Sequence, residues 1–466
     1  MGVGHLSRLV IVSNRVANLR KTTQTGGLAV GLADALKQRG GVWFGWSGKI
    51  EADGGDEQPN VDKIGKVTRV SIGLTERDYE EYYLGYANSV LWPLCHYRLD
   101  LVNFQQAYFE GYVRVNRKFA SCLLPFLEPR DMIWVHDYHL MPLAEELRRS
   151  GCRQRIGFFL HIPFPPPDLL AAATSHEYLV ECLSAYDLIG FQTEADLTNF
   201  RRYIEENSGA EELADGLMRM GGNTFEAGAF PIGIDVDHFA EMAEKGSEEV
   251  AIDQMRRQML GRKQVVGVDR LDYSKGLPDR FKAFERLLEI HPDIHKKVSL
   301  LQIAPPTRED VQSYADIREE LERLSGAING RFADFNWTPI RYLHRNVPRD
   351  KLAALFRSSQ VGFVTPLRDG MNLVAKEFVA AQEKDDPGVL VLSQFAGAAE
   401  QMVEALIVNP YDIDAMAEAL YLALTMPLDE RKKRHEALFR RIKAGDACAW
   451  LNGFLAALEN SRPVAA

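Results

Sequence analysis

The chain has 466 residues, which is too long for one ordinary domain and predicts two or three. Hydrophobic residues at 46% and charged residues at 26% are typical of a globular protein. The net charge of −10, without a basic block or stripe, argues against nucleic acid as the main partner. The first apolar run is only Leu9–Val12 and no cysteine pair has the C-x-x-C spacing, so we expect a cytoplasmic protein with reduced thiols and no signal peptide or membrane anchor.

Short apolar runs alternate with helical segments along the whole chain, which predicts mostly parallel sheets covered by helices. In the first half, the expected strands are 8–13, 42–47, 67–72, 132–136, 156–160, 188–191 and 230–234. After a polar, helical crossing at 235–263, the expected strands are 264–268, 299–304, 338–347, 361–364, 389–392 and 406–408. We therefore expect domains at 1–235 and 236–445, followed by a helix within 446–466 that packs on the first domain.

Polar side chains follow the expected strands of the first half at their carboxyl ends, where ligands bind in open α/β sheets. Arg15, Asp137 and His161 each come after such a strand. His161 also opens a proline-rich loop, whose backbone is rigid and non-helical. An ordinary surface charge is the alternative for Arg15, and the pair Gly26-Gly27 before an expected helix at 29–38 is by itself a weak phosphate-loop signal.

The stretch 79–97 is unusually aromatic and includes Tyr83 and Trp92. Most of these rings are expected to pack in the core. One or two of them commonly wall a sugar pocket, because an aromatic ring combines an apolar face with a polar edge.

Two loops of the second half point to an anionic ligand. Arg270 and Lys275 lie five residues apart between an expected strand and helix, and a planar guanidinium with a compact ammonium suits a diphosphate. The stretch Thr365–Glu377 ends another strand and opens a helix, whose first N–H groups and dipole attract anions. Within it, Gly370 would let the backbone approach a ligand closely, although an ordinary strand–loop–helix corner is the alternative. Arg308 follows a third strand.

No metal site is expected. The triplets Asp235–Asp237 and Asp412–Asp414 have the D-x-D spacing that holds a divalent ion in some nucleotide-sugar enzymes, but so short a pattern arises easily by chance. No H-E-x-x-H, P-loop or G-x-S-x-G motif is present.

Taken together, the motifs resemble those of the trehalose-6-phosphate synthases, retaining glycosyltransferases of family 20. They are VSNR at 12–15, GGLA at 26–29, WFGWSG at 43–48, LWPLCHYR at 91–98, VHDYHL at 135–140, FLHIPFP at 159–165, RLDYSKGLP at 270–278 and TPLRDGMNLVAKE at 365–377. The resemblance covers nearly the whole chain and implies the GT-B architecture, an α/β fold of two doubly wound Rossmann-like domains facing a central cleft. Small departures occur at Pro166, where a Thr is common, and at Asp269, where a Glu is common.

In this family, glucose moves from a nucleoside diphosphate glucose, usually UDP-glucose, to glucose 6-phosphate. The resemblance therefore implies α,α-trehalose 6-phosphate as the product, retention of configuration, no cofactor and no metal. It places the acceptor at Arg15, Tyr83, Trp92, Asp137 and Arg308, with the two arginines on the phosphate. It places the donor at Gly26, Gly27, Arg270, Lys275, Asp369, Gly370, Met371, Asn372, Leu373, Val374, Ala375, Lys376 and Glu377. His161 and Asp369 match contacts to the transferred glucose, and with Arg270 and Lys275 they form the expected catalytic set.

The alternatives are an enzyme of the same fold with another acceptor, such as glycerol 3-phosphate or a cyclitol, and a non-catalytic sugar-phosphate sensor. A sensor would be expected to lose a diphosphate cation or the Asp369-Gly370 loop, and these residues are present. A fused phosphatase is not expected, because the chain ends soon after the second domain. The sequence leaves open the nucleotide base and the oligomeric state, for which a dimer or a tetramer are the options.

Overall fold

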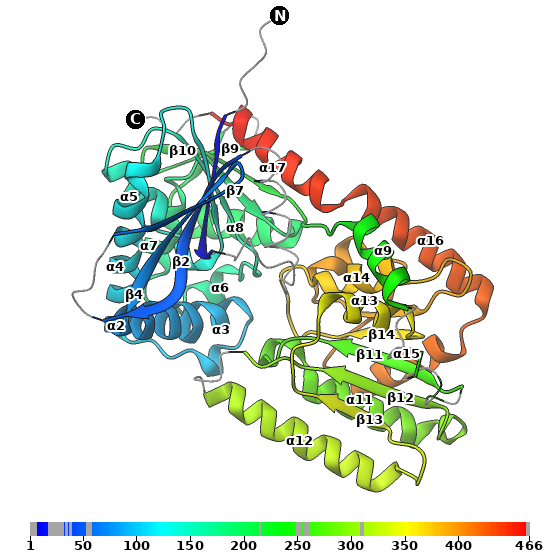
Figure 1. Ribbon diagram of the computed structural model, residues 1–466. Helices are drawn as coiled ribbons and strands as arrows, with labels where there is room; N and C mark the ends of the chain where they lie inside the picture. Colours follow the sequence, from blue (N-terminus) through cyan, green and yellow to red (C-terminus); the bar gives the residue numbers. More distant parts are fainter. Residues whose placement is uncertain are drawn as a thin grey trace, which may run out of the picture. The chain divides into compact units, whose positions relative to one another are not determined.

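The computed structural model describes residues 7–16, 32, 36, 40–52, 58–213, 216–247, 253–254, 257, 259, 261–307 and 312–462. The chain divides into two compact units (Figure 1): Met1–Pro231 with Trp450–Ala466, and Ile232–Ala449. The domain boundaries expected at 235/236 and 445/446 lie within four residues of these divisions.

The first unit is built on a sheet whose described strands run in the order β3-β4-β2-β1-β5-β6-β7-β10-β9-β8. Their bounds are β1 (Leu9–Arg15), β2 (Gly41–Glu51), β3 (Asn60–Ile64), β4 (Val67–Thr75), β5 (Met132–His136), β6 (Arg155–Phe159), β7 (Leu188–Phe191), β8 (Glu211–Glu212), β9 (Leu217–Met220) and β10 (Asn223–Ala229). The strands from β4 to β10 in this order are paired in parallel, and β3, β8 and β9 add antiparallel edges. β1 lies between β2 and β5 and is parallel to both, so the carboxyl ends of β1 and β5 lie side by side at the same edge of the sheet.

The strand predicted at 230–234 is wrong, because that segment is a loop and the strand is β10, which ends at Ala229. The apolar run at 230–234 contains Pro231, which has no N–H for a ladder, and Gly233, which the backbone approaches closely. A Cβ on Gly233 would lie 2.1 Å from the carbonyl oxygen of Gly445. The run is apolar because it is the packed crossing into the second unit.

The helical segments of the first unit lie between these strands. They are α2 (Glu76–Asp78), a π-helix at Tyr79–Leu91, α3 (Trp92–Cys95), α4 (Gln106–Leu123), α5 (Leu143–Arg149), α6 (Pro167–Leu170), α7 (His176–Leu183) and α8 (Glu194–Asn207). A π-helix this long is rare, and π-helical turns often mark functional sites. It carries the aromatic stretch singled out in the sequence.

The last helix, α17 (Ala447–Asn460), packs on the sheet of the first unit. The ring of Phe454 stacks on Trp134 of β5 at 4.5 Å between centroids. Gly157 in β6 and Gly190 in β7 make room for it, since a Cβ at either position would lie within 3 Å of the Phe454 ring. Two glycines inside strands are thus explained by the close approach of this helix.

The second unit has a parallel sheet in the order β13-β12-β11-β14-β15-β16 among its described residues. The strands are β11 (Lys263–Val268), β12 (Val298–Ile303), β13 (Ile340–Leu343), β14 (Val361–Val364), β15 (Val389–Ser393) and β16 (Leu406–Val408). Numbered within the unit, this is the 3-2-1-4-5-6 order of the doubly wound fold, whose strand order reverses between β11 and β14. The strand predicted at 338–347 is real but shorter.

Helices cover the sheet of the second unit on both faces. They are α9 (Val236–Ser247), α11 (Leu277–Ile290), α12 (Gln312–Phe332), α13 (Arg349–Arg357), α14 (Leu373–Ala381), α15 (Ile413–Thr425) and α16 (Leu428–Ala444). α11 packs against α12 and α15, whereas α14 packs against α9, α13 and α16. The core between α11, α15 and the sheet is aliphatic and aromatic, as the continuous apolar strands require.

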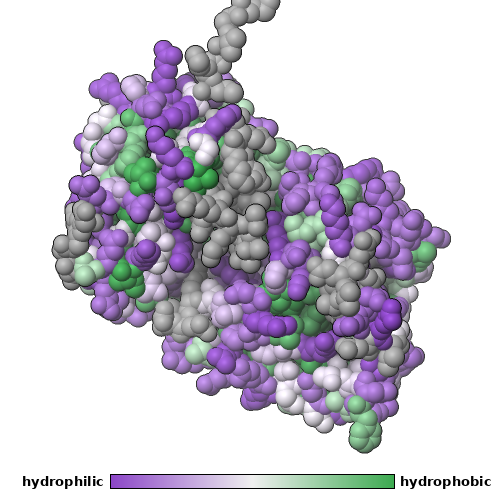
Figure 2. All heavy atoms as spheres, viewed as in Figure 1, coloured by the Kyte–Doolittle hydropathy of each residue, from purple (hydrophilic) through white to green (hydrophobic). Residues whose placement is uncertain are grey.

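Hydrophilic residues cover most of the face shown in Figure 2, with small separate hydrophobic patches. Within the described part of the chain, no helix has the length and apolarity to cross a membrane. The first acid of each D-x-D triplet bonds the start of a helix: Asp235 and Asp412 accept hydrogen bonds from the N–H groups of His238 and Ala415, at the starts of α9 and α15.

Candidate active site

Arg15 is the last residue of β1 and lies at the switch point of the first unit, between β2 and β5. Its guanidinium carbon lies 5.4 Å from the centre of the Trp46 ring, a cation–π contact that orients an exposed side chain. Gly48 has φ +84, and a Cβ there would lie 2.2 Å from an Arg15 nitrogen. The glycine therefore leaves space for the arginine.

Asp137 directly follows β5 and has an unusual backbone, with φ 77 and ψ 163. This region is occupied almost only by glycine, and holding another residue there costs about 1–3 kcal/mol. The strain is maintained by two hydrogen bonds, one to the end of β6 and one to the loop after it: Asp137 N–H donates to Phe159 O at 2.8 Å, and Asp137 Oδ1 accepts from the N–H of His161 at 3.2 Å. Such strain is typical of functional sites.

The half-buried ring of His161 is held by side chains on both of its nitrogens. Nε2 lies 3.1 Å from Nδ1 of His136, and Nδ1 lies 3.3 Å from Nε2 of Gln192. Burial lowers the pKa of His161 to about 3, and burial followed by the neighbouring His161 lowers the pKa of His136. Both rings are therefore neutral near pH 7, so His161 can make hydrogen bonds but cannot supply a positive charge.

Aromatic rings lie beside these strand ends. Tyr83, in the π-helix, stacks on Tyr79 at 5.4 Å and on His139 at 5.9 Å. The ring of Trp92 is buried. Its centre lies 4.2 Å from the centre of the His96 ring, and it also contacts Tyr138. Because Tyr138 and His139 directly follow Asp137, the structure joins both sequence-predicted aromatics to the loop after β5.

Three sequence-predicted site residues, Gly26, Gly27 and Arg308, lie outside the described residues.

In the second unit, the loops after β11 and β14 meet at the switch point of the sheet. Leu367 N–H donates to Ser274 O at 2.8 Å, which ties one loop to the other. Lys275 is buried, and its Nζ lies 2.6 Å from Asp369 Oδ2. Arg270 is exposed at the end of β11 on the same loop. The structure thus brings the sequence-predicted Lys275 and Asp369 into contact, and it places Arg270 on the same loop as Lys275.

Arg280, a residue that the sequence analysis missed, lies in α11 and holds the loop after β11 in place with its buried side chain. It is 0% exposed, and its Nη1 donates to Asp269 Oδ2 at 2.7 Å and to Gln302 Oε1 at 3.0 Å. Its Nε reaches Thr365 Oγ1, after β14, at 3.2 Å. Gly276, with φ +64, allows the same loop to turn into α11, since a Cβ there would lie 2.6 Å from the backbone oxygen of Thr365.

The loop after β14 is also anchored to the loop after β15. Asp369 N–H donates to Phe395 O, and Ala398 N–H donates to Met371 O at 2.8 Å. Asn372 then caps α14: it has φ 70, its Oδ1 accepts from Ala375 N–H, and its Nδ2 donates to Asp369 Oδ2 at 3.0 Å.

The residues of the predicted donor stretch differ in exposure. Gly370, Met371, Asn372 and Ala375 are buried, whereas Leu373 and Val374, in the first turn of α14, are partly exposed. The N–H groups of a first helical turn have no partner within the helix, so Leu373 and Val374 are positioned to present theirs to an anion.

Lys376 and Glu377 lie in α14 with their side chains engaged by the protein. Lys376 is 1% exposed, and its Nζ donates to Ile232 O at 2.7 Å and to Gln401 Oε1 at 2.8 Å. Glu377 forms an ion pair with Arg349 at 3.0 Å, and burial raises the pKa of its carboxyl group. Arg349 is a second residue that the sequence analysis missed.

Lys376 makes the stability of the fold depend on pH. Burial lowers its pKa from 10.5 to about 7, so between these values the unfolded chain binds more protons than the folded chain. The contribution of Lys376 to the free energy of unfolding is therefore lowest below pH 7 and rises with pH through this window, by at most about 1.4 kcal/mol per pH unit. We expect Lys376→Met to remove this rise, as measured by urea unfolding of both proteins at pH 7 and 9. A rise of equal size in the variant would contradict this origin.

Known proteins resemble the chain along nearly all of its length. The family model of glycosyltransferase family 20 matches residues 7–460. A trehalose-6-phosphate synthase from Klebsiella pneumoniae is 51% identical over 461 residues, covering 98% of this chain and 96% of the relative.

Solved structures agree with this result. An α,α-trehalose-phosphate synthase (UDP-forming) from Burkholderia xenovorans, in complex with glucose-6-phosphate, has a TM-score of 0.94 at 52% identity and covers 97% of this chain and 100% of its own. An E. coli structure described as bound with UDP-2-fluoro glucose has a TM-score of 0.94 at 48% identity, covering 98% and 100%. The predicted GT-B class, with two Rossmann-like domains, is confirmed. The chain belongs to glycosyltransferase family 20.

Proposed function

We propose that the chain transfers glucose from UDP-glucose to glucose 6-phosphate and releases UDP and α,α-trehalose 6-phosphate. The observation that carries the proposal is the Lys275–Asp369 pair at the switch point of the second unit, in a chain about half identical to trehalose-6-phosphate synthases over nearly its full length. The enzyme's relatives with glucose-6-phosphate and with UDP-2-fluoro glucose support both substrates.

Charge develops on the leaving diphosphate as the bond to the anomeric carbon breaks, and Arg270 with Lys275 is suited to stabilise it. The partly exposed start of α14 is proposed to supply further N–H groups for the diphosphate. Glu377, beyond it, is proposed to contact the ribose. No carboxylate pair of the kind used by retaining glycosidases is proposed, because Asp369 is already bonded to Lys275 and Asn372.

Asp369 and His161 are proposed to hold the transferred glucose. A carboxylate accepts hydrogen bonds from sugar hydroxyls, and a neutral imidazole can bond one when that hydroxyl replaces the 3.3 Å contact of His161 Nδ1 with Gln192. Without a protein nucleophile, the acceptor hydroxyl attacks from the same face as the departing diphosphate, whose oxygen takes its proton. This path retains the configuration at the anomeric carbon.

The acceptor is proposed to bind with its phosphate on Arg15 and Arg308, and with its sugar ring beside Tyr83, Trp92 and Asp137. We expect Arg308→Ala to lower kcat/KM for glucose 6-phosphate by the equivalent of about 2–4 kcal/mol, because a charge-assisted bond and its positioning effect are lost. Steady-state kinetics with each substrate varied tests this. A large loss of donor affinity with unchanged acceptor kinetics would contradict this role and would assign Arg308 to the donor site instead.

Transfer is proposed to need no divalent ion and no cofactor, since the leaving group has cationic side chains of its own. Activity after dialysis against excess EDTA should equal that of the untreated protein. Activity that disappears and returns only when Mg²⁺ or Mn²⁺ is added would contradict the proposed role of Arg270 and Lys275.

A donor-by-acceptor matrix that measures released nucleoside diphosphate tests the substrates. We expect the highest rate with UDP-glucose and glucose 6-phosphate. Preference for glycerol 3-phosphate or a cyclitol would indicate an enzyme of the same fold with another acceptor. Binding of both substrates without release of nucleoside diphosphate would indicate a non-catalytic sensor. The cytoplasmic location and the oligomeric state stay predictions.

A further inference from the structure

The second unit contains a cavity of about 370 Å³ at the edge of its sheet opposite the candidate active site. Lys263 is the first residue of β11, Gln360 directly precedes β14 and Gly388 directly precedes β15, and all three line the cavity. Arg270 and Asp369 instead follow the carboxyl ends of β11 and β14. The six residues of β11 span about 20 Å. The cavity is therefore separate from the proposed donor site.

The lining of this cavity is strongly cationic, although the whole chain has a net charge of −10. One carboxylate, Asp386, accompanies four cations: Arg262, Lys263, Arg357 and Arg431. Asp386 pairs with Arg431 at 2.6 Å, and Glu383, beside the cavity, pairs with Arg357 at 3.1 Å. Lys263 donates to the backbone oxygen of Leu424, and Arg262 donates to that of Lys296, so neither of these charges is neutralised by its bond.

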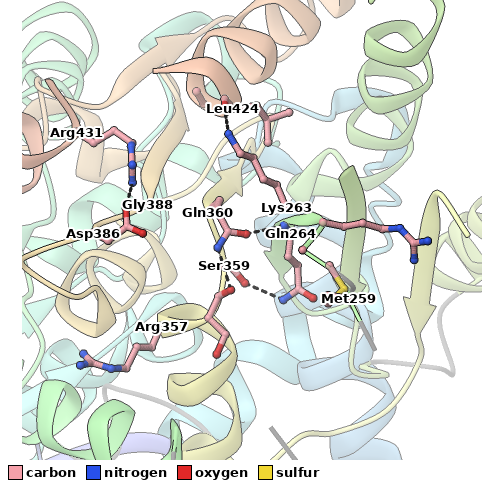
Figure 3. A pocket seen from close by; sticks show the side chains of 14 residues that line it. Met259, Lys263, Gln264, Arg357, Ser359, Gln360, Asp386, Gly388, Leu424 and Arg431 are labelled. Carbon is pink, nitrogen blue, oxygen red and sulfur yellow. Dashed lines mark hydrogen bonds and ion pairs between the residues drawn. The ribbon is translucent and has the colours of Figure 1, made fainter. Parts of the chain in front are cut away.

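Two buried polar atoms of the lining have no hydrogen-bond partner among the described residues: Nε of Arg357, a donor, and Oε1 of Gln264, an acceptor. The Gln264 side chain is nevertheless fixed, because its Nε2 donates to Ser359 Oγ at 2.8 Å. Its backbone N–H also donates to Gln360 Oε1 at 2.8 Å. Figure 3 shows this polar network of Gln264, Ser359 and Gln360. An unpaired buried donor and acceptor are costly, and a ligand with an anionic oxygen and a hydroxyl would satisfy both once the two side chains turn toward the cavity.

We propose that this cavity binds a small phosphate monoester that carries hydroxyl groups. The guanidinium of Arg357 and the ammonium of Lys263 would bind the phosphate oxygens, because a planar guanidinium and a compact ammonium both suit an anionic phosphate. Gln264 Oε1 would accept from a hydroxyl of the ligand. The volume lies near the lower end of the range of small-molecule pockets and suits a compound of this size.

Glycerol 3-phosphate is a suitable probe, titrated into the full-length protein by isothermal calorimetry. Because the probe could also enter the proposed acceptor site, Arg15→Ala serves to separate the two. We expect Lys263→Gln/Arg357→Gln to raise Kd for the cavity by about tenfold or more, and Arg15→Ala to leave that Kd unchanged. Arg440→Gln, on the exposed face of α16, is the matched charge control and should have no effect.

Lys263→Gln alone removes an exposed side chain and guards against misfolding of the double variant; it should raise Kd by about threefold. Inorganic phosphate should bind at least about threefold more weakly than glycerol 3-phosphate, because it has no carbon-borne hydroxyl for Gln264. Binding that is lost in Arg15→Ala and unchanged in the double variant would overturn the proposal. Equal affinity for the two probes would overturn the assignment of a hydroxyl-bearing ligand.

Discussion

Replacing Lys275 with alanine is expected to lower kcat by about 10²-fold or more and to raise KM for the donor. Lys275 is buried on the loop that leaves β11, and its ammonium group lies 2.6 Å from Asp369. The diphosphate is already anionic in the ground state, so the lysine contributes to donor binding. Its charge increases as the glycosidic bond breaks, and the lysine therefore contributes more in the transition state.

Among the described residues, the variant leaves Asn372 as the side-chain hydrogen-bond partner of the Asp369 carboxylate, so Asp369 is less well positioned for the sugar. Lys275→Arg should restore activity only in part, because a planar fork does not replace a compact ammonium. Lys282→Ala, seven residues along the chain on α11, is the matched control and should retain kcat. A raised KM with unchanged kcat at saturating donor would show that Lys275 only attracts the substrate.

Arg280→Met is expected to destabilise the second unit by about 3–5 kcal/mol, because it leaves the buried carboxylate of Asp269 without its cation. Desolvation by burial already raises the pKa of Asp269, and Arg280 is the largest influence that lowers it. The same arginine bonds Gln302 and Thr365, so the substitution also loosens the loops after β11 and β14. Urea unfolding of the purified variant measures the loss.

Arg286→Met is the matched control for Arg280→Met, because it lies on the same helix and has an exposed ion pair with Asp414. Exposed pairs contribute little, so its stability should be close to that of the unchanged protein. Similar unfolding curves for the two variants would contradict the structural role assigned to Arg280. Loss of activity in Arg280→Met without loss of stability would instead place Arg280 in the chemistry.

The sequence predicted the sheets well where apolar runs are uninterrupted. The strands at 132–136, 188–191 and 361–364 have the predicted bounds, because all of their residues are buried and the apolar runs coincide with the strands. The edge strand at 406–408 also has the predicted bounds, although Ile407 is exposed. The position of Lys275 and Asp369 was also predictable, since both follow the carboxyl ends of parallel strands. What the sequence could not give is the 2.6 Å contact between them, which depends on two loops 94 residues apart.

Other features depend on packing that no local pattern reveals. The run at 230–234 is as apolar as a strand, but it is buried as a domain crossing beside Gly445. Arg280 did leave a signal: it lies at helical spacing on the buried face of α11, between Leu277 and Phe284. An arginine at such a position predicts a buried anionic partner, and Asp269 is that partner.

The product of UDP-glucose and glucose 6-phosphate, identified by NMR of its anomeric positions, tests the central claim most directly. The account predicts one equivalent of UDP and a non-reducing disaccharide phosphate with both anomeric centres in the α configuration. A β linkage at the transferred glucose would contradict front-face transfer with retention. Free glucose with no disaccharide would contradict glucose 6-phosphate as the acceptor.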